Sequence, residues 1–331
     1  MPARKTTALF IILLVITASL VLISTFLLIR VSTRAAGVVR QKQGEPYKYH
    51  IMMIGERIDS AFWQEVYAGA SEEGSRNSAI IELVGPASDA DNKTPDEYIN
   101  YAIDARVDGI LAFINDKPAT RQSLLTAASK GIPVITLEND VLNTSRESFV
   151  GVSSYELGKL LGGLIHEAAG EVGNALVLIN DVTMKSSGNI MLSSIQEAIQ
   201  SYPSLHVSPI GFNNSSRDSG YEELIRQRIL NDTNLEVIVC LNVEDTMRVA
   251  QTVIDLNKSD RIAIIAFRES KDILDYVRKG IVYAVVVIDA RQMGMKAAAS
   301  MFEFLETKHA NDYVITDMHV VKKETVEEYL K

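Results

Sequence analysis

Short apolar runs alternate with longer amphipathic segments along most of the chain. The runs predict strands at 50–54, 80–84, 109–113, 134–137, 149–152, 175–179, 206–210, 237–241, 262–267, 284–288 and 313–321. Between them, apolar residues recur at helical spacing. Phe62, Val66 and Ala70 lie four residues apart and predict a helix over 61–76. Strands that alternate with helices are typical of βαβ units, whose mostly parallel sheets are covered by helices on both faces.

The number of predicted strands sets the domain count. About eleven strands are too many for one comfortable doubly wound sheet, so we expect two doubly wound α/β lobes. In such sheets ligands bind beyond the carboxyl ends of the strands. The loops that follow each strand are therefore the places to search for a binding site.

An uncharged apolar run extends from Ala8 to Ile29. At about 1.5 Å per residue it forms a helix of about 33 Å, which is long enough to cross a bilayer. We interpret 8–31 as an uncleaved transmembrane anchor, with a short tail at 1–7 and a stalk at 32–47. A cleavable signal peptide usually has a shorter apolar core that ends at small residues, whereas charged residues follow this run. The basic residues on both sides leave the orientation open.

Composition narrows the functional classes. The chain has 331 residues and a formal net charge of -9, which argues against a nucleic-acid partner. The only cysteine, Cys240, lies in an apolar run and is predicted to be a buried strand residue. One cysteine excludes an internal disulfide and a cysteine metal cluster, and the five histidines lack metal-ligand spacing. We expect no metal and no cofactor.

Two aromatic residues follow the first predicted strand. Asp59 or Ser60 is a suitable N-cap for the helix that contains Phe62 and Trp63. Adjacent side chains of a helix point in different directions, so Phe62 and Trp63 cannot both be fully buried in the core. Trp63 is the only tryptophan, and its ring either stacks on a sugar or packs at the helix start.

Polar residues follow two further strands. Glu138 and Asn139 come directly after the run at 134–137, where they either accept bonds from ligand hydroxyls or form a solvated turn. Arg268 follows the run at 262–267. Its guanidinium suits a ligand anion, or it pairs with Asp59 or Glu138.

Enzyme signatures are not found. The segment 151–159 is glycine-containing, but its spacing exceeds that of a phosphate-binding loop and Leu160 replaces the required hydroxyl residue. The sequence contains neither a Gly-x-Ser-x-Gly elbow nor a His-Glu-x-x-His motif. We therefore predict a protein that is not an enzyme.

Several segments together resemble one family. Residues 130–138 read Lys-Gly-Ile-Pro-Val-Ile-Thr-Leu-Glu and resemble a signature of the ribose/galactose-type (type I) periplasmic binding proteins. The segments 107–112, 151–158 and 291–294 resemble other elements of that family, in the same order and with similar spacing. The similarity extends from about residue 50 to 323.

The resemblance implies two lobes joined by three hinge strands, near Gly151, Asp289 and Ile315. The N-terminal lobe would comprise 48–151 and 289–315, the C-terminal lobe 152–288 and 316–323, and a tail 324–331. A monosaccharide would lie between the lobes and close them, with its ring sandwiched by Phe62 and Trp63. By position, its hydroxyls would bond to Asp59, Glu138, Asn139, Asn189 and Asn242.

Two positions depart from the family. Arg268 stands where the family usually has an aspartate, and Ile288 where it usually has a glutamine. Each buried ligand group left unpaired costs about 1–3 kcal/mol. Three alternatives follow: the ligand differs from ribose or glucose, for example by a negative charge; Arg268 pairs with an acidic neighbour; or the receptor works through a protein partner.

The combined expectation is a membrane-tethered extracytoplasmic receptor that signals sugar occupancy to a membrane partner such as a histidine kinase or a chemoreceptor. The alternative is the binding component of a sugar ABC importer, which would dock a permease. A doubly wound enzyme is a minor alternative. A transcriptional repressor would carry DNA-binding helices where this chain has its apolar run.

Overall fold

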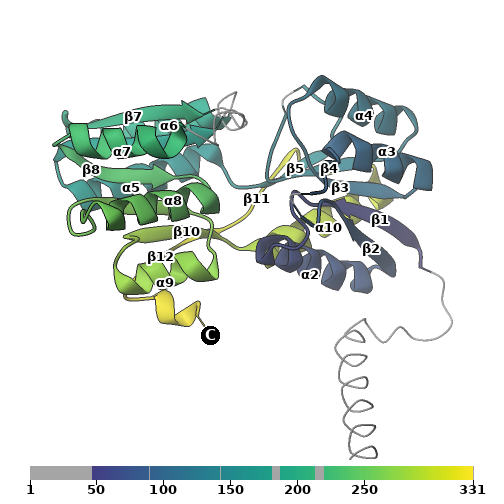
Figure 1. The fold of residues 1–331 in the computed structure, drawn as a ribbon. Helices are drawn as coiled ribbons and strands as arrows, with labels where there is room; N and C mark the ends of the chain where they lie inside the picture. The colour runs from purple at the N-terminus through teal and green to yellow at the C-terminus, as the bar shows by residue number, and fades with distance from the viewer. Residues whose placement is uncertain (1–46, 89, 142, 181–186, 213–219, 331) are drawn as a thin grey trace, which may run out of the picture. The chain divides into compact units, whose positions relative to one another are not determined.

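The apolar runs form two six-stranded sheets in the described part of the chain (Figure 1). Sheet A has the order β11-β5-β4-β3-β1-β2. Its strands are β1 (Tyr49–Ile54), β2 (Ala79–Val84), β3 (Gly109–Phe113), β4 (Val134–Leu137), β5 (Ser148–Gly151) and β11 (Tyr313–Ile315). Sheet B has the order β12-β10-β9-β8-β6-β7. Its strands are β6 (Val172–Asn180), β7 (Ser204–Phe212), β8 (Leu235–Cys240), β9 (Ala263–Phe267), β10 (Ala284–Ile288) and β12 (Met318–Lys322).

The structure is a computed structural model and describes residues 47–88, 90–141, 143–180, 187–212 and 220–330. The predicted tail at 1–7, the anchor at 8–31 and all of the stalk except residue 47 lie outside these ranges. Among the residues that are described, none of the helices combines the length and the apolar character needed to span a bilayer.

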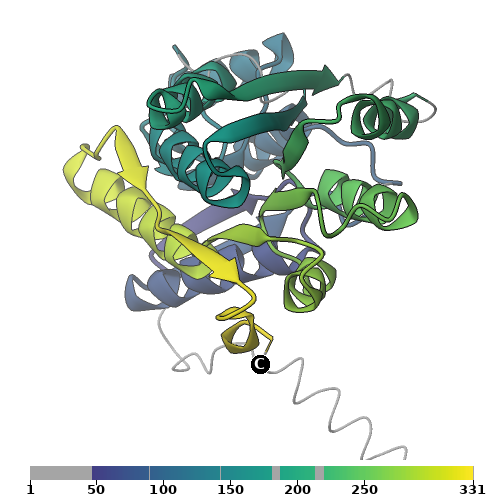
Figure 2. The same cartoon turned by 90° about the vertical axis from the view of Figure 1, so that its left-hand side faces the viewer.

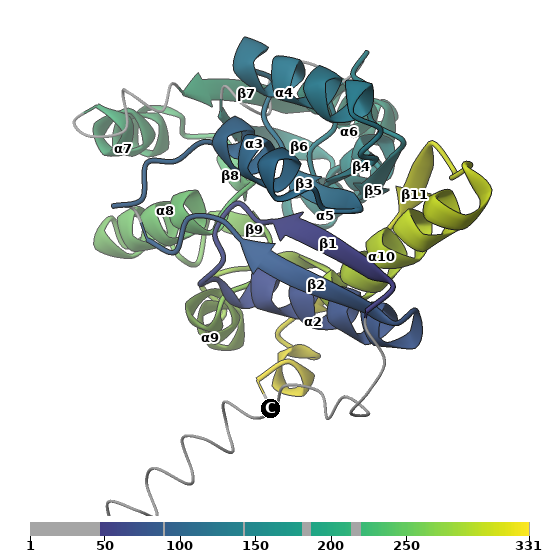
Figure 3. The same cartoon turned by 90° about the vertical axis from the view of Figure 1, so that its right-hand side faces the viewer.

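Helices cover both faces of each sheet, as expected for βαβ units. On sheet A, α3 (Pro95–Ala105) and α4 (Pro118–Ser129) lie on one side, and α2 (Ala61–Arg76) and α10 (Ala290–Thr307) on the other (Figure 3). We call sheet A with these helices the N-terminal lobe. Alternate residues of β1 face the two layers: Ile51 and Met53 pack towards α2, while Met52 and Ile54 pack towards α3.

The C-terminal lobe is built in the same way around sheet B. One face packs against α5 (Ser154–Ala169) and α6 (Ser187–Ile199). The other packs against α7 (Tyr221–Asn231), α8 (Val243–Asp255) and α9 (Lys271–Lys279). In Figure 2, the green helices of residues 243–279 lie along one side of the strands.

The end of the chain departs from prediction in three ways. The apolar run at 313–321 is two strands in different sheets, because Thr316 and Asp317 interrupt it. The second of these strands, β12, is antiparallel to β10, so sheet B is not wholly parallel. The segment expected as a tail forms a short 3₁₀-helix, Val326–Glu328, whose Val326 is fully buried against the C-terminal lobe.

The chain passes between the sheets three times, after β5, after β10 and after β11. These crossings are hydrogen-bonded to one another. The Thr316 N–H donates to the Gly151 carbonyl at 2.8 Å, and the Asp289 N–H donates to the Asp317 carbonyl at 3.1 Å. The Gln292 amide also exchanges two hydrogen bonds with Asp317. The three connections therefore form one bonded group.

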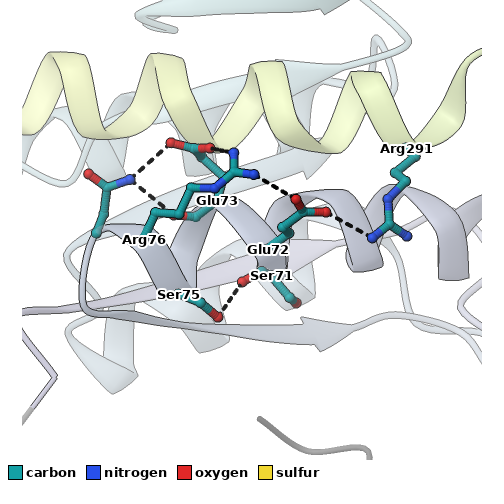
Figure 4. A network of polar contacts seen from close by, with 7 residues as sticks. Ser71, Glu72, Glu73, Ser75, Arg76 and Arg291 are labelled. Carbon is teal, nitrogen blue, oxygen red and sulfur yellow. Dashed lines mark hydrogen bonds and ion pairs between the residues drawn. The ribbon is translucent and has the colours of Figure 1, made fainter. Parts of the chain in front are cut away.

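Helices α2 and α10 approach each other so closely that glycine is required at the contact. A Cβ on Gly294 would lie 1.8 Å from the carbonyl oxygen of Val66, and one on Gly69 would lie 2.0 Å from the carbonyl oxygen of Arg291. Polar side chains continue the contact at the surface, where Arg291 reaches Glu72 at 2.8 Å (Figure 4). Helix α10, which follows the second crossing, is thus fixed to α2.

The prediction for Cys240 is confirmed, since its side chain is 0% exposed on β8. Burial raises the pKa of this thiol well above its usual value, so it stays protonated at pH 8. We expect iodoacetamide to alkylate Cys240 on the order of 10³-fold more slowly in the native protein than in urea, because reaction requires global unfolding. Mass spectrometry of the labelled chain measures this ratio. Equal rates in the two states would contradict the burial of β8.

Candidate functional site

Two site residues occupy the first position after a strand, one in each lobe. Glu138 follows β4 and Arg268 follows β9, and their φ angles are 65° and 73°. Left-handed backbone is uncommon for residues other than glycine and costs of order 1–3 kcal/mol. Each is fixed by a backbone bond to the neighbouring strand: Glu138 N–H donates to Val150, and Arg268 N–H to Val286. Such residues cluster at binding sites, where the fold determines their position.

The Arg268 side chain reaches from the C-terminal lobe to three residues of the N-terminal lobe. Its guanidinium forms an ion pair with the Glu138 carboxylate, and its Nη1 lies 3.6 Å from Glu56 Oε2. The guanidinium carbon lies 5.0 Å from the centre of the Phe62 ring, within cation–π range. The pairing with Glu138, one of the two outcomes that the sequence left open, is therefore the one observed.

The side chains of the site are largely shielded from water, and this burial shifts the pKa values of its charged groups. The Glu138 side chain is 7% exposed and the Arg268 side chain 21%. Burial lowers the pKa of Arg268, and the nearby Glu56 opposes this effect, so the guanidinium keeps its proton. Burial also raises the pKa of the neighbouring Glu269. The Arg268 guanidinium thus faces the carboxylates of Glu56 and Glu138. Within the described residues, the site therefore has no unpaired positive charge for an anionic ligand.

Three site residues have buried polar atoms without a hydrogen-bond partner. These atoms are Trp63 Nε1, Glu138 Oε2 and Arg268 Nε. Buried polar atoms are nearly always paired, so unpaired ones at a strand end need an explanation. They comprise two donors and one acceptor, which is a set that ligand hydroxyl groups can satisfy.

The two adjacent aromatic rings have different environments. Ser60 caps α2 by accepting from the Trp63 N–H at 3.3 Å, which sets the rotation of this first turn. Phe62 is half-buried and faces Arg268. Trp63 is 1% exposed and packs edge-on against Phe113, with ring centres 5.9 Å apart. The expectation that both rings sandwich a sugar is therefore corrected: Trp63 has the core-packing role and offers only its indole nitrogen.

The other predicted site residues are less closely grouped. Asp59 is exposed and pairs with Arg57 at 2.8 Å. Asn139 follows Glu138, and its amide donates to the Ile114 carbonyl at 3.4 Å. Asn242 caps α8 by accepting from the Asp245 N–H at 2.7 Å. Asn189 is exposed in the first turn of α6.

Glu56 was missed by sequence reasoning, although it contacts Arg268. The available signal was its place two residues after β1, at the same sheet edge as Phe62 and Glu138. No metal centre competes for these carboxylates: nowhere in residues 47–330, apart from the gaps stated above, do three His, Cys, Asp or Glu side chains gather to hold an ion.

Two surface cavities lie elsewhere on the C-terminal lobe. One, of about 500 Å³, lies between α5 and β12 and is lined by Leu160, Leu164 and Val320. The other, of about 590 Å³, lies between α7 and α8 and is lined mainly by charged residues. Neither cavity is lined by Phe62, Glu138 or Arg268, so both are separate from the site at the ends of β4 and β9.

The chain was compared with known proteins. A family model described as a periplasmic binding protein domain matches residues 51–309. No curated protein sequence matches at a significant level. Solved structures that are 18% to 24% identical have a similar fold, and at this level of identity the likeness concerns the fold alone.

Three of these structures are representative. GanP, a glucose-galactose binding protein from Geobacillus stearothermophilus, is 21% identical to this chain, with a TM-score of 0.74. The alignment covers 83% of this chain and 98% of GanP. The XylFII-LytSN complex contains a chain 24% identical with a TM-score of 0.70, covering 85% and 100%. A sugar-binding protein of a sugar ABC transporter from Bacillus halodurans is 19% identical with a TM-score of 0.75, covering 85% and 99%.

Proposed function

Because this chain belongs to the periplasmic binding protein family, we propose that it is an extracytoplasmic receptor that binds a monosaccharide between its two lobes. The observation that carries the proposal is the meeting of Phe62, Glu138 and Arg268 at strand ends of both lobes. The aromatic face of Phe62 and the carboxylate of Glu138 provide apolar contact and a hydrogen-bond acceptor for a sugar, at the point where Arg268 reaches across from the other lobe. The proteins of similar fold described as glucose-galactose binding and sugar-binding support this choice.

The receptor would be attached to the membrane by residues 8–31, with its lobes outside the cytoplasm. Closure of two lobes on a ligand converts binding into a shape change that a partner detects. The structure described as the XylFII-LytSN complex supports a protein partner for this fold. We therefore propose that the receptor reports occupancy to a membrane sensor such as a histidine kinase.

The second candidate is the binding component of a sugar ABC importer. It is favoured by the fold likeness to the sugar-binding protein from Bacillus halodurans. The genes that flank this one distinguish the two functions: a kinase gene supports the sensor, whereas permease and ATPase genes support the importer.

Ligand binding can be tested on the full-length chain in detergent. Trp63 is the only tryptophan and touches Phe62, with ring centres 5.6 Å apart, so its fluorescence reports on the site. A panel of neutral monosaccharides, sugar acids and sugar phosphates should give a thermal shift with a neutral sugar only. At 100 times its Kd, that sugar should stabilise the fold by about 2.7 kcal/mol. No shift across the panel would contradict sugar binding.

Phe62→Ala should weaken binding of the identified sugar about 10-fold, because it removes the half-buried aromatic face on which the sugar would stack. Tyr101→Ala is the matched control, since Tyr101 is a 55% exposed aromatic residue on α3. Isothermal titration calorimetry measures both Kd values. An unchanged Kd for Phe62→Ala would place the sugar elsewhere.

A further inference from the structure

One side chain bridges the two lobes. Arg268 belongs to the C-terminal lobe, and its three partners Glu56, Phe62 and Glu138 belong to the N-terminal lobe. Each partner comes from a different segment: the turn after β1, the first turn of α2 and the turn after β4. A contact of this kind is lost when the lobes separate.

The bridge uses the groups that a ligand would need. The guanidinium lies over the face of Phe62, which is the one aromatic surface available for a sugar ring at this site. The guanidinium also forms an ion pair with one oxygen of the Glu138 carboxylate, Oε1. A ligand that stacks on Phe62 and bonds to this oxygen must first displace the guanidinium.

Two other arginines, Arg146 and Arg57, form ion pairs within the N-terminal lobe. Arg146 is held by Asp140 at 2.6 Å and by Asp312, and its side chain is only 7% exposed. Arg57 is paired with Asp59 on the same turn of the N-terminal lobe. Asp59 and Asp140 thus each have an arginine partner within their own lobe, whereas the pairs of Arg268 with Glu56 and Glu138 cross between the lobes.

From this arrangement we propose that Arg268 is an interlobe latch: its contacts with Glu138, Glu56 and Phe62 hold the lobes together without ligand, and an incoming ligand competes with it. The competition with a ligand rests on the proposed function, whereas the contact that holds the lobes together does not.

The unpaired atoms of the latch support exchange rather than permanent closure. Glu138 Oε2 and Arg268 Nε lack partners, so the pair is incompletely satisfied. Buried ion pairs with incomplete hydrogen bonding contribute little net stability, because desolvation offsets their attraction. A ligand hydroxyl group can donate to Glu138, and water can accept from Arg268 once the guanidinium is displaced. A ligand can thus separate the pair and leave neither charge unpaired.

The latch predicts a change in the ligand-free distance between the lobes. Spin labels can be attached at Tyr101→Cys on α3 and Leu230→Cys on α7, which are 55% and 54% exposed. The native Cys240 is fully buried and stays unlabelled. Double electron–electron resonance on the full-length chain then gives the distance distribution. Arg268→Gln and Glu138→Gln should each shift it to longer distances, and Arg278→Gln, which removes an exposed pair within α9, should not.

The affinity for a sugar supplies a second, independent readout. If about nine-tenths of the ligand-free protein is latched, Arg268→Gln should lower the Kd about 10-fold. Unchanged distances in Arg268→Gln and Glu138→Gln would overturn the latch, and a weaker Kd in Arg268→Gln would make Arg268 a ligand contact and overturn the competition. Longer distances without binding of any panel sugar would uphold the latch and refute the proposed function.

Discussion

Gly294→Ala should lower the free energy of unfolding by about 3 kcal/mol, which is a loss of about 6–12 °C in Tm. The new methyl group would lie 1.8 Å from the Val66 carbonyl oxygen and 2.8 Å from the Ala70 nitrogen. Both are backbone atoms of α2, so no side-chain rotation can relieve the overlap. The helices must separate, and Trp63 and Val66 lose part of their packing. Urea unfolding followed by circular dichroism measures the change.

The same chain provides a matched control for this substitution. Gly163 lies in α5, is exposed, and would place its Cβ more than 4 Å from any neighbour. Gly163→Ala should therefore stabilise the protein by about 0.5–1 kcal/mol, because alanine loses less backbone entropy in a helix. If Gly294→Ala were as stable as the parent protein, the close contact between α2 and α10 would be wrong.

Arg146→Met should destabilise the protein by about 3–5 kcal/mol, because it leaves a largely buried carboxylate without its partner. The guanidinium makes two bonds to Asp140, at 2.6 and 2.9 Å, and a third to the Asp312 carbonyl at 3.0 Å. The Asp140 side chain is 14% exposed, so water cannot replace these bonds. The Tyr313 ring, 4.8 Å away, covers the guanidinium.

The expected effect extends to the site. Arg146 ties the end of the loop after β4 to the strand β11, and Glu138 begins that loop. We expect weaker sugar binding together with the lower stability. The control is Arg278→Met, which removes an exposed pair with Asp275 and should change the stability by less than about 1 kcal/mol. Equal losses in the two variants would show that Asp140 finds another partner.

The strands could be predicted from the sequence because most of them are buried on both faces of their sheet. Strands buried on both faces become continuous apolar runs, as with Gly109–Phe113 and Ala284–Ile288, where prediction and structure have the same bounds. Hydrophobicity does not say which sheet a run joins. Hydrophobicity therefore showed 313–321 as one run, and only the family resemblance implied a change of lobe near Ile315. The antiparallel direction of β12 was not predicted.

The site was predictable to the level of the sheet edge. Parallel strands bring their carboxyl ends together, which placed Phe62, Glu138 and Arg268 near one another. The assignment of Trp63 failed because the rotation of α2 decides which of two adjacent rings is buried. That rotation depends on the Ser60 cap and on Phe113, which is distant in sequence. Glu56 was missed since a glutamate in a turn has no periodicity to reveal its partner.

The order of the three crossings also has a consequence for synthesis on the ribosome. When residue 288 has emerged, both sheets contain most of their strands, yet neither lobe is finished. The N-terminal lobe still lacks α10, so Val66 and Ala70 have no covering helix, and the C-terminal lobe still lacks β12. Residues 289–331, about the last eighth of the chain, supply both missing parts. The nascent protein must therefore hold two open cores until translation is nearly complete, and a chain that stops early leaves no intact lobe behind.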